Sequence, residues 1–199
     1  MKAWLGVLTV ASVATLFSPV ARAANDDWTT YRLHGCSDFT VDAPADIERL
    51  ATLKDSDLLL SLGKFYPAGG VLTCSVFIKP YPATLPYPVY SERFQAADPV
   101  QFCYAGGSDA KDVTVLDRAK FKADGLPAAH CATGYTDPAD KERPGHVHSL
   151  TTIIHPLCLY YLTCSVDDVD QESAQAEWAF DGIGNLVKDM ESRMHVSSP

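Results

Sequence analysis

Six cysteines are the feature that most constrains how this chain folds. An even number of cysteines in an exported chain is typical of a disulfide framework, and the sequence alone does not fix how they pair. Cys158 and Cys164 are not expected to pair, because they lie on one predicted strand about 20 Å apart and a disulfide needs Cα atoms within about 7 Å. The candidates for cross-links are Cys36, Cys74, Cys103, Cys131, Cys158 and Cys164.

The N-terminal segment has the three parts of a secretory signal peptide. Lys2 supplies the positive charge, Trp4 to Phe17 is an apolar run, and Ala21-Arg22-Ala23 matches the small-residue site that signal peptidase cleaves. The apolar run is too short for a membrane span, which needs about 20 residues. We therefore expect residues 1–23 to be removed near Ala23/Ala24. Residues 24–199 would then be a periplasmic or secreted protein with no membrane span.

The charge balance disfavours nucleic acid as a partner. The chain has 16 Lys and Arg residues against 25 Asp and Glu residues, a net charge of −9. Loss of the leader takes away Lys2 and Arg22, which leaves −11 on the mature chain. An acidic surface repels phosphate backbones and attracts basic proteins. We expect a protein partner and no nucleic acid, and the oligomeric state stays open.

The order of apolar patterns and turns predicts an α+β fold. Alternation predicts hairpins over 58–79 and 146–166, and Asp124-Gly125 predicts a tight turn between two further strands. Antiparallel strands with helices on their faces form a central sheet in an α/β/α sandwich. We expect one such domain over residues 24–199.

The remaining segments are predicted less regularly. Residues 24–35 are expected to be a loose lead-in, 45–57 a short helix or a loop, and 89–97 a short helix. A long C-terminal helix is predicted over Gln171–Met194, with a possible kink at Gly182 and Gly184. Its apolar stripe consists of Phe180, Ile183, Val187, Met190 and Met194.

Three segments resemble the PsbP/Mog1-like group of proteins. They are Phe39-Thr40-Val41-Asp42-Ala43-Pro44, the turn Asp124-Gly125-Leu126-Pro127-Ala128, and the closing helix from Trp178 to Val187. The resemblance implies a central antiparallel sheet flanked by helices, and an accessory or binding role. It carries over no catalytic residue, and the six cysteines and a proline-rich connector depart from it.

That connector, residues 77–90, is the predicted interaction surface. Its prolines stiffen an extended chain, and Tyr81, Tyr87 and Tyr90 offer large side chains that lose little entropy on binding. The alternative is that these tyrosines lie on the core, where a tyrosine hydroxyl finds a partner.

His146 and His148 form the candidate metal site. Residues two apart on a strand share a face, so both imidazoles are able to approach one ion. His130, on a neighbouring predicted strand, is the candidate third ligand. The alternative is that His146 and His148 face solvent beside a charged loop.

Enzyme motifs are missing from the sequence. It contains no G-x-S-x-G elbow, no zinc-protease helix motif and no C-x-x-C knuckle, and no cofactor is expected. His130 with Cys131 and His155 with Cys158 lack a signal for an activated thiolate, and an oxidising compartment favours disulfides. The first hypothesis is an exported, non-catalytic binding or accessory protein with a protein partner, such as an inhibitor or immunity protein. The alternatives are a periplasmic metal-binding protein using His146 and His148, and an enzyme that its motifs do not reveal.

Overall fold

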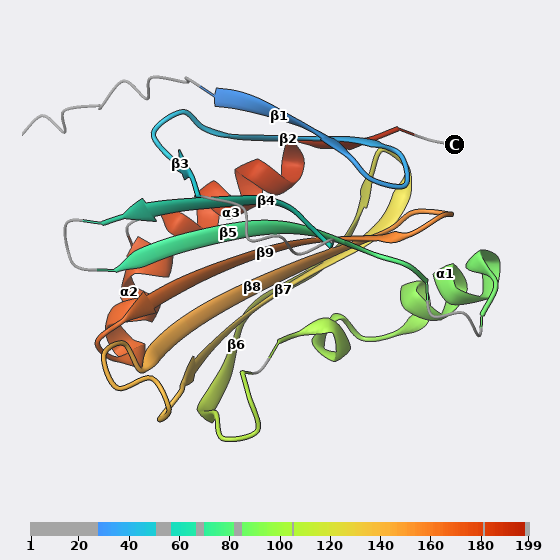
Figure 1. Cartoon of the computed structure of the whole chain (residues 1–199). Coiled ribbons are helices and arrows are strands. Elements are labelled where there is room, and N and C mark those ends of the chain that lie inside the picture. Colours follow the sequence, from blue (N-terminus) through green and yellow to red (C-terminus); the bar gives the residue numbers. More distant parts are fainter. Residues whose placement is uncertain are drawn as a thin grey trace, which may run out of the picture.

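Antiparallel strands in two sheets form the framework of the protein, whose computed structural model describes residues 28–50, 57–66, 70–81, 85–104, 106–180 and 182–197 (Figure 1). The main sheet has seven strands in the spatial order β3-β4-β5-β9-β8-β7-β6. In that order they are β3 (Glu48–Arg49), β4 (Leu58–Phe65), β5 (Val71–Lys79), β9 (Leu159–Asp168), β8 (Gly145–Ile154), β7 (Leu126–Thr136) and β6 (Lys111–Ala123).

A smaller sheet and three α-helices complete the fold. The smaller sheet has the order β1-β2-β10, with β1 (Trp28–His34), β2 (Asp38–Pro44) and β10 (Met194–Val196). The helices are α1 (Tyr87–Ala96), the short 3₁₀ helix η1 (Pro99–Phe102), α2 (Gln171–Phe180) and α3 (Ile183–Ser192). The predicted α+β class, a large antiparallel sheet with helices, is confirmed.

One face of the main sheet, which we call the inner face, carries the larger core. Alternate residues of β9 point to it, among them Tyr160 and Leu162, and they are buried against α2, α3 and β2. Phe39 of β2 stacks on the Tyr160 ring with centroids 4.8 Å apart. The smaller sheet, α2 and α3 thus share the covering of this face (Figure 1).

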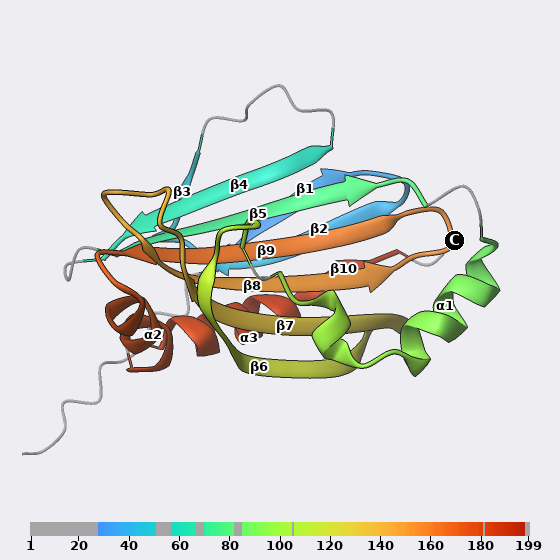
Figure 2. The same cartoon turned by 90° about the horizontal axis from the view of Figure 1, so that it is seen from below.

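The opposite face, the outer face, is covered at one end by the segment that holds α1 and η1. Figure 2 shows this segment crossing the sheet near β6 and β7. Phe94 of α1 is buried there against Ala129, Ile154 and Leu159. Helices therefore lie on both faces of the sheet, as the sandwich prediction requires.

The turn between β6 and β7 confirms the Asp124-Gly125 prediction. Both residues have positive φ, 48° and 83°. Two-residue hairpin loops with positive φ at both positions match the twist of antiparallel strands, and Asp-Gly is a preferred sequence for them. The hairpins predicted over 58–79 and 146–166 are also present, as β4–β5 and β8–β9.

One prediction at the start of the domain was wrong, and a second is correct only in part. Residues 28–34 do not belong to a loose lead-in, because they form β1 and pair with β2 over seven residues. The segment 45–57, predicted as a short helix or a loop, contains the short strand β3, which pairs with Gly63 and Leu62 of β4. In both cases the pairing partner, which local sequence does not reveal, decides the structure.

The predicted long C-terminal helix is two helices, divided at Gly182, one of the two glycines where a kink was predicted. Gly182 adopts a left-handed conformation with φ 79° and separates α2 from α3. Ile183, Val187 and Met190 keep the predicted buried stripe on α3, whereas Phe180 at the end of α2 is 87% exposed. The chain then leaves the helix, so that Met194 begins β10 and pairs with β2.

Some predictions lie outside the described residues. They are the signal peptide, its cleavage site, residues 24–27 of the lead-in, residues 51–56 and connector residues 82–84. Among the described helices, none is long and apolar enough to cross a membrane.

Candidate functional site

The three tyrosines predicted as an interaction surface lie together. Tyr81 follows β5, and Tyr87 and Tyr90 lie on α1. The Tyr81 ring meets the other two edge to face, with centroids 6.2 Å from Tyr87 and 5.2 Å from Tyr90. All three side chains are half-buried, so each packs on the protein with one side and remains accessible on another.

Polar and apolar contacts fix this cluster to the end of the sheet. The Tyr81 hydroxyl donates a hydrogen bond to the carbonyl of His155, in the turn between β8 and β9. Burial, with smaller contributions from the neighbouring tyrosines, raises the pKa of Tyr81 above its usual range, and burial raises that of Tyr90 as well. The hydroxyls are therefore neutral over the physiological range and able to donate hydrogen bonds.

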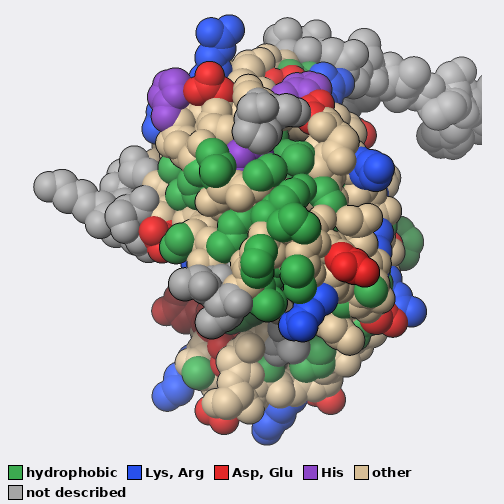
Figure 3. Space-filling model, turned by 90° about the vertical axis from the view of Figure 1, so that its right-hand side faces the viewer, with side chains coloured by type: hydrophobic (Ala, Val, Ile, Leu, Met, Phe, Trp, Pro, Cys, Tyr) green, Lys and Arg blue, Asp and Glu red, His purple; other side chains and the backbone are tan. Residues whose placement is uncertain are grey.

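Exposed apolar side chains surround the tyrosines. Val89 of α1 is 38% exposed, and Leu157 of the β8–β9 turn is 59% exposed. Pro86 and Pro88 are exposed beside them. Figure 3 views the side of the molecule on which α1 lies and shows hydrophobic side chains gathered there. We call this surface the tyrosine platform: Tyr81, Pro86, Tyr87, Pro88, Val89, Tyr90 and Leu157.

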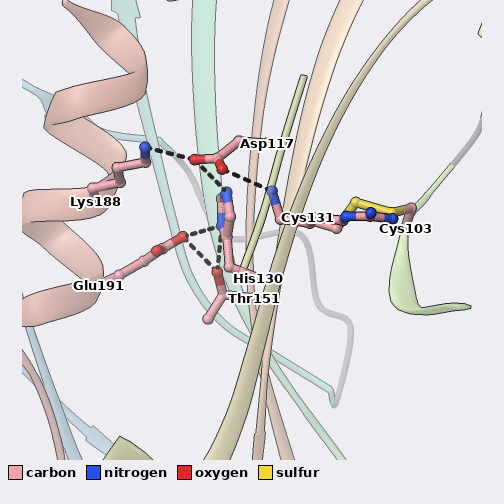
Figure 4. Close-up of polar contacts among 8 residues, drawn as sticks. Cys103, Asp117, His130, Cys131, Thr151, Lys188 and Glu191 are labelled. Carbon is pink, nitrogen blue, oxygen red and sulfur yellow. Dashed lines mark hydrogen bonds and ion pairs between the residues drawn. A yellow bond between two sulfur atoms is a disulfide. The ribbon is translucent and has the colours of Figure 1, made fainter. Parts of the chain in front are cut away.

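His130 belongs to a different group of residues, on the inner face (Figure 4). Its side chain is 2% exposed, and Nδ1 lies 2.7 Å from Oε1 of Glu191 on α3 and 3.2 Å from the hydroxyl of Thr151. The Thr151 hydroxyl also donates to the Glu191 carboxylate, at 2.5 Å. These contacts join α3 to β7 and β8, which gives His130 a clear structural role.

Asp117 stands between His130 and the surface. Its carboxylate lies 4.0 Å from Nε2 of His130 and 2.5 Å from Nζ of Lys188 (Figure 4). Burial alone would raise the pKa of Asp117, but the hydrogen bond and charge of Lys188, with smaller contributions from Arg118 and His130, lower it overall. A groove of about 640 Å³ between β6, α2 and α3 is lined by Asp117 and Lys188. His130 is not among its lining residues, so the network does not present the imidazole to a substrate there.

His146 and His148 share the outer face, as predicted from their spacing. Nδ1 of His146 lies 2.7 Å from Oδ1 of Asp167, and this hydrogen bond raises the pKa of His146 although burial opposes it. Burial lowers the pKa of His148 to about 4. His146 Nε2 and His148 Nδ1 are buried, and neither has a hydrogen-bond partner among the described residues.

His130 does not join these two histidines. In the β7–β8 register His130 lies opposite Thr151, and Thr133 lies opposite His148. Directly opposed residues share a face and neighbours along a strand alternate, so His130 is on the inner face and His148 on the outer face. The three-histidine site proposed from the sequence is therefore not assembled.

Three disulfides connect the six cysteines: Cys36–Cys158, Cys74–Cys164 and Cys103–Cys131. Cys158 and Cys164 are not paired with each other, as strand geometry required. Cys103–Cys131 ties the end of the η1 segment to β7, and Cys36–Cys158 ties the β1–β2 turn to the β8–β9 turn. His155 lies beside the Cys36–Cys158 disulfide, with its Nδ1 3.5 Å from Cys36 Sγ.

Sequence reasoning included Val89 in the predicted connector but missed the contribution of Leu157 to the platform and the contact between Cys36 and His155. Cys36 and His155 are 119 residues apart, so no local motif signals their contact. The one signal in the sequence for Leu157 is its place in the turn between two predicted strands, where an apolar side chain is more exposed than it would be within a strand.

No protein-family model matches the sequence, and a search of curated proteins finds no match. Solved structures do match. The Ran-binding protein Mog1p of Saccharomyces cerevisiae is 11% identical, with a TM-score of 0.53 over 86% of this chain and 96% of Mog1p. LpqN of Mycobacterium tuberculosis, involved in cell envelope biogenesis, is 11% identical, with a TM-score of 0.51 over 87% of this chain and 91% of LpqN.

A cyanobacterial PsbP from Synechocystis is 15% identical and covers 90% of this chain and 100% of its own, with a TM-score of 0.47. At these identities the matches to Mog1p and LpqN establish the fold alone. The PsbP/Mog1-like resemblance inferred from the sequence is thereby confirmed as a statement about fold.

Proposed function

We propose that the mature protein is an exported, non-catalytic binding or accessory protein, and that the tyrosine platform is where it holds a protein partner. The carrying observation is that the half-buried tyrosines and the exposed Val89 and Leu157 lie together on one end of the molecule. Tyrosines and prolines pre-ordered in this way provide contact area at little cost in entropy. The fold is compatible with this role, because Mog1p is a Ran-binding protein.

The partner that fits is a folded protein with a basic surface around an apolar centre. The chain has a net charge of −9, and −11 without the expected leader. Complementary charge mainly speeds association and selects the partner, while the apolar centre supplies most of the affinity. An inhibitor or immunity protein that neutralises a basic effector is one instance of this function.

The test compares two matched pairs of substitutions in the protein purified from its native compartment at native expression. Val89→Asp/Leu157→Asp changes the platform, whereas Val113→Asp/Val115→Asp changes two valines of β6 that are 46% and 42% exposed. We expect a stoichiometric partner with the wild type and with the β6 variant. With the purified partner, the platform variant should bind at least about 30-fold more weakly, which corresponds to a hot spot of about 2 kcal/mol.

The opposite pattern would refute the proposal. If no stoichiometric protein accompanies the wild type, or if the platform variant keeps its partner while the β6 variant loses it, the platform is not the binding surface. Circular dichroism of both variants checks that neither result comes from unfolding.

A second function, binding of a divalent metal ion, is favoured by the two unpartnered nitrogens of His146 and His148. The hydrogen bond from His146 to Asp167 is the arrangement in which a carboxylate orients a metal-binding imidazole. Calorimetric titration of copper(II) or zinc into the oxidised protein tests it. Binding should disappear in His146→Gln/His148→Gln and persist in a control that changes the exposed His34 and His195; equal binding by both variants would exclude the site.

A further inference from the structure

Cys36, His155 and Cys158 form the only group of three potential metal ligands within bonding reach of one another among the described residues. One ligand atom of each lies within 4.8 Å of the others. Cys36 lies in the β1–β2 turn, and the other two lie in the β8–β9 turn. The two cysteines are joined as a disulfide across 122 residues of sequence, so this arrangement comes from the tertiary fold alone.

His155 has its lone pair on the sulfur side. The backbone N–H of Leu157 donates to Nδ1 at 3.2 Å, which assigns the lone pair to Nδ1, and an ion bound at Nδ1 would replace this N–H as the partner of the lone pair. The same Nδ1 lies 3.5 Å from Cys36 Sγ. The neutral imidazole is the form that binds metal ions.

Neighbouring residues hold the three side chains in place. The Tyr160 hydroxyl lies 3.5 Å from Cys36 Sγ and accepts a hydrogen bond from the Ser37 N–H at 3.0 Å. Tyr81 donates to the His155 carbonyl. Cys36 is partly exposed while His155 and Cys158 are buried, which leaves one side open for an ion and closes the others.

We propose that reduction of the Cys36–Cys158 disulfide converts this group into a zinc site. A dithiol reductant gives up two electrons and two protons and becomes a disulfide, while the S–S bond of the protein breaks to two thiols. Binding of Zn²⁺ then releases the two thiol protons and forms two Zn–S bonds and one Zn–N bond to Nδ1 of His155. A water molecule completes the tetrahedral coordination that zinc adopts with sulfur and nitrogen ligands.

Zinc in this position joins the same two turns as the disulfide. The β1–β2 turn and the β8–β9 turn therefore stay cross-linked in both redox states. The site does not depend on the tyrosine platform having a partner, because its ligands and their supports are all within this chain.

The test measures zinc affinity in the whole protein after reduction with dithiothreitol and anaerobic removal of the reductant. A chromophoric zinc chelator serves as the competitor, and thiol titration confirms reduction. We expect one Zn²⁺ per reduced chain and none at this site in the oxidised protein. His155→Ala should weaken zinc binding by more than about tenfold. Removal of a residue that only hydrogen-bonds a metal ligand already costs about tenfold or more, and His155 is proposed as a ligand itself.

Cys36→Ser/Cys158→Ser, which keeps the other four cysteines, is the matched control. It should gain no zinc site on reduction, whatever zinc its histidines bind, and cobalt substituted for zinc should show thiolate charge-transfer absorption only in the protein that retains Cys36 and Cys158. The proposal fails if the reduced wild type binds no stoichiometric zinc, or if the control variant binds it as tightly. Unfolding of the reduced protein in the presence of zinc would also overturn it, because the site needs both turns in place.

Discussion

Removing the Glu191 carboxylate should destabilise the protein more than removal of any exposed carboxylate. Glu191 is 7% exposed and accepts from the buried Thr151 hydroxyl, and its Oε1 lies 2.7 Å from Nδ1 of His130. In Glu191→Ala both groups stay buried without that acceptor. Leaving a buried polar group without its partner costs about 1–3 kcal/mol, and two groups lose an acceptor here, so the loss is a large part of the total stability of about 5–15 kcal/mol of a domain.

Urea unfolding of the oxidised protein, followed by circular dichroism, measures this effect. Glu92→Ala, an exposed glutamate of α1, is the control and should stay within about 0.5 kcal/mol of the wild type. Replacing the whole group by Glu191→Leu/His130→Leu/Thr151→Val should recover most of the loss, because apolar residues leave no polar group unpaired.

Two results would refute this reasoning. A Glu191→Ala protein within about 1 kcal/mol of the wild type would mean that water already satisfies His130 and Thr151. An apolar triple variant that is no more stable than Glu191→Ala would mean that the carboxylate is important for packing rather than for its hydrogen bonds.

Two further predictions concern the outer face and the loop before α2. The hydrogen bond to Asp167 raises the pKa of His146 in the folded protein. The stabilisation that this bond gives is therefore complete at pH values below the pKa of His146 in the unfolded chain, and it is lost as the pH rises through the pKa of His146 in the folded protein. Asp167→Asn should therefore lower the free energy of unfolding more at pH 6 than at pH 9, and an equal loss at both would contradict the assignment. Gly145→Ala should lower the free energy of unfolding by about 3 kcal/mol or more, because a Cβ there would lie 1.9 Å from the backbone carbon of Asp170. The control is Gly107→Ala, which should be tolerated because nothing lies within 4 Å of a Cβ at Gly107. Urea unfolding of the two variants measures the difference, and equal stability would contradict the prediction.

The sheet was predictable because its signals are local. The alternation in β5 and β9 and the Asp124-Gly125 turn each depend on a few consecutive residues. β1 carries only a weak signal of this kind, because Leu33 is its one buried residue. Its stability comes from pairing with β2, which lies beyond what a short window of sequence contains.

The histidines show why sites are harder to predict than strands. Spacing alone placed His146 and His148 on one face, since both are on β8. Placing His130 required the register of β7 against β8, which is set across the loop from Thr136 to Gly145. A shift of one residue in that register moves every side chain of the strand to the other face, and the sequence does not fix it.

The cysteines and the tyrosine platform, which are separate features of the sequence, depend on each other in the structure. In the segment 85–104 only Ser91 and Phe94 are fully buried, and half-buried aromatic side chains of the segment pack around Phe94. Cys103–Cys131 anchors the end of this segment to β7, and Cys36–Cys158 anchors the turn that carries Leu157.

A surface ordered before binding loses less entropy when the partner arrives. The disulfides thus add to the rigidity that these contacts give the proposed binding surface. An oxidising compartment, which keeps Cys103–Cys131 closed, therefore favours the proposed function as well as the stability of the fold.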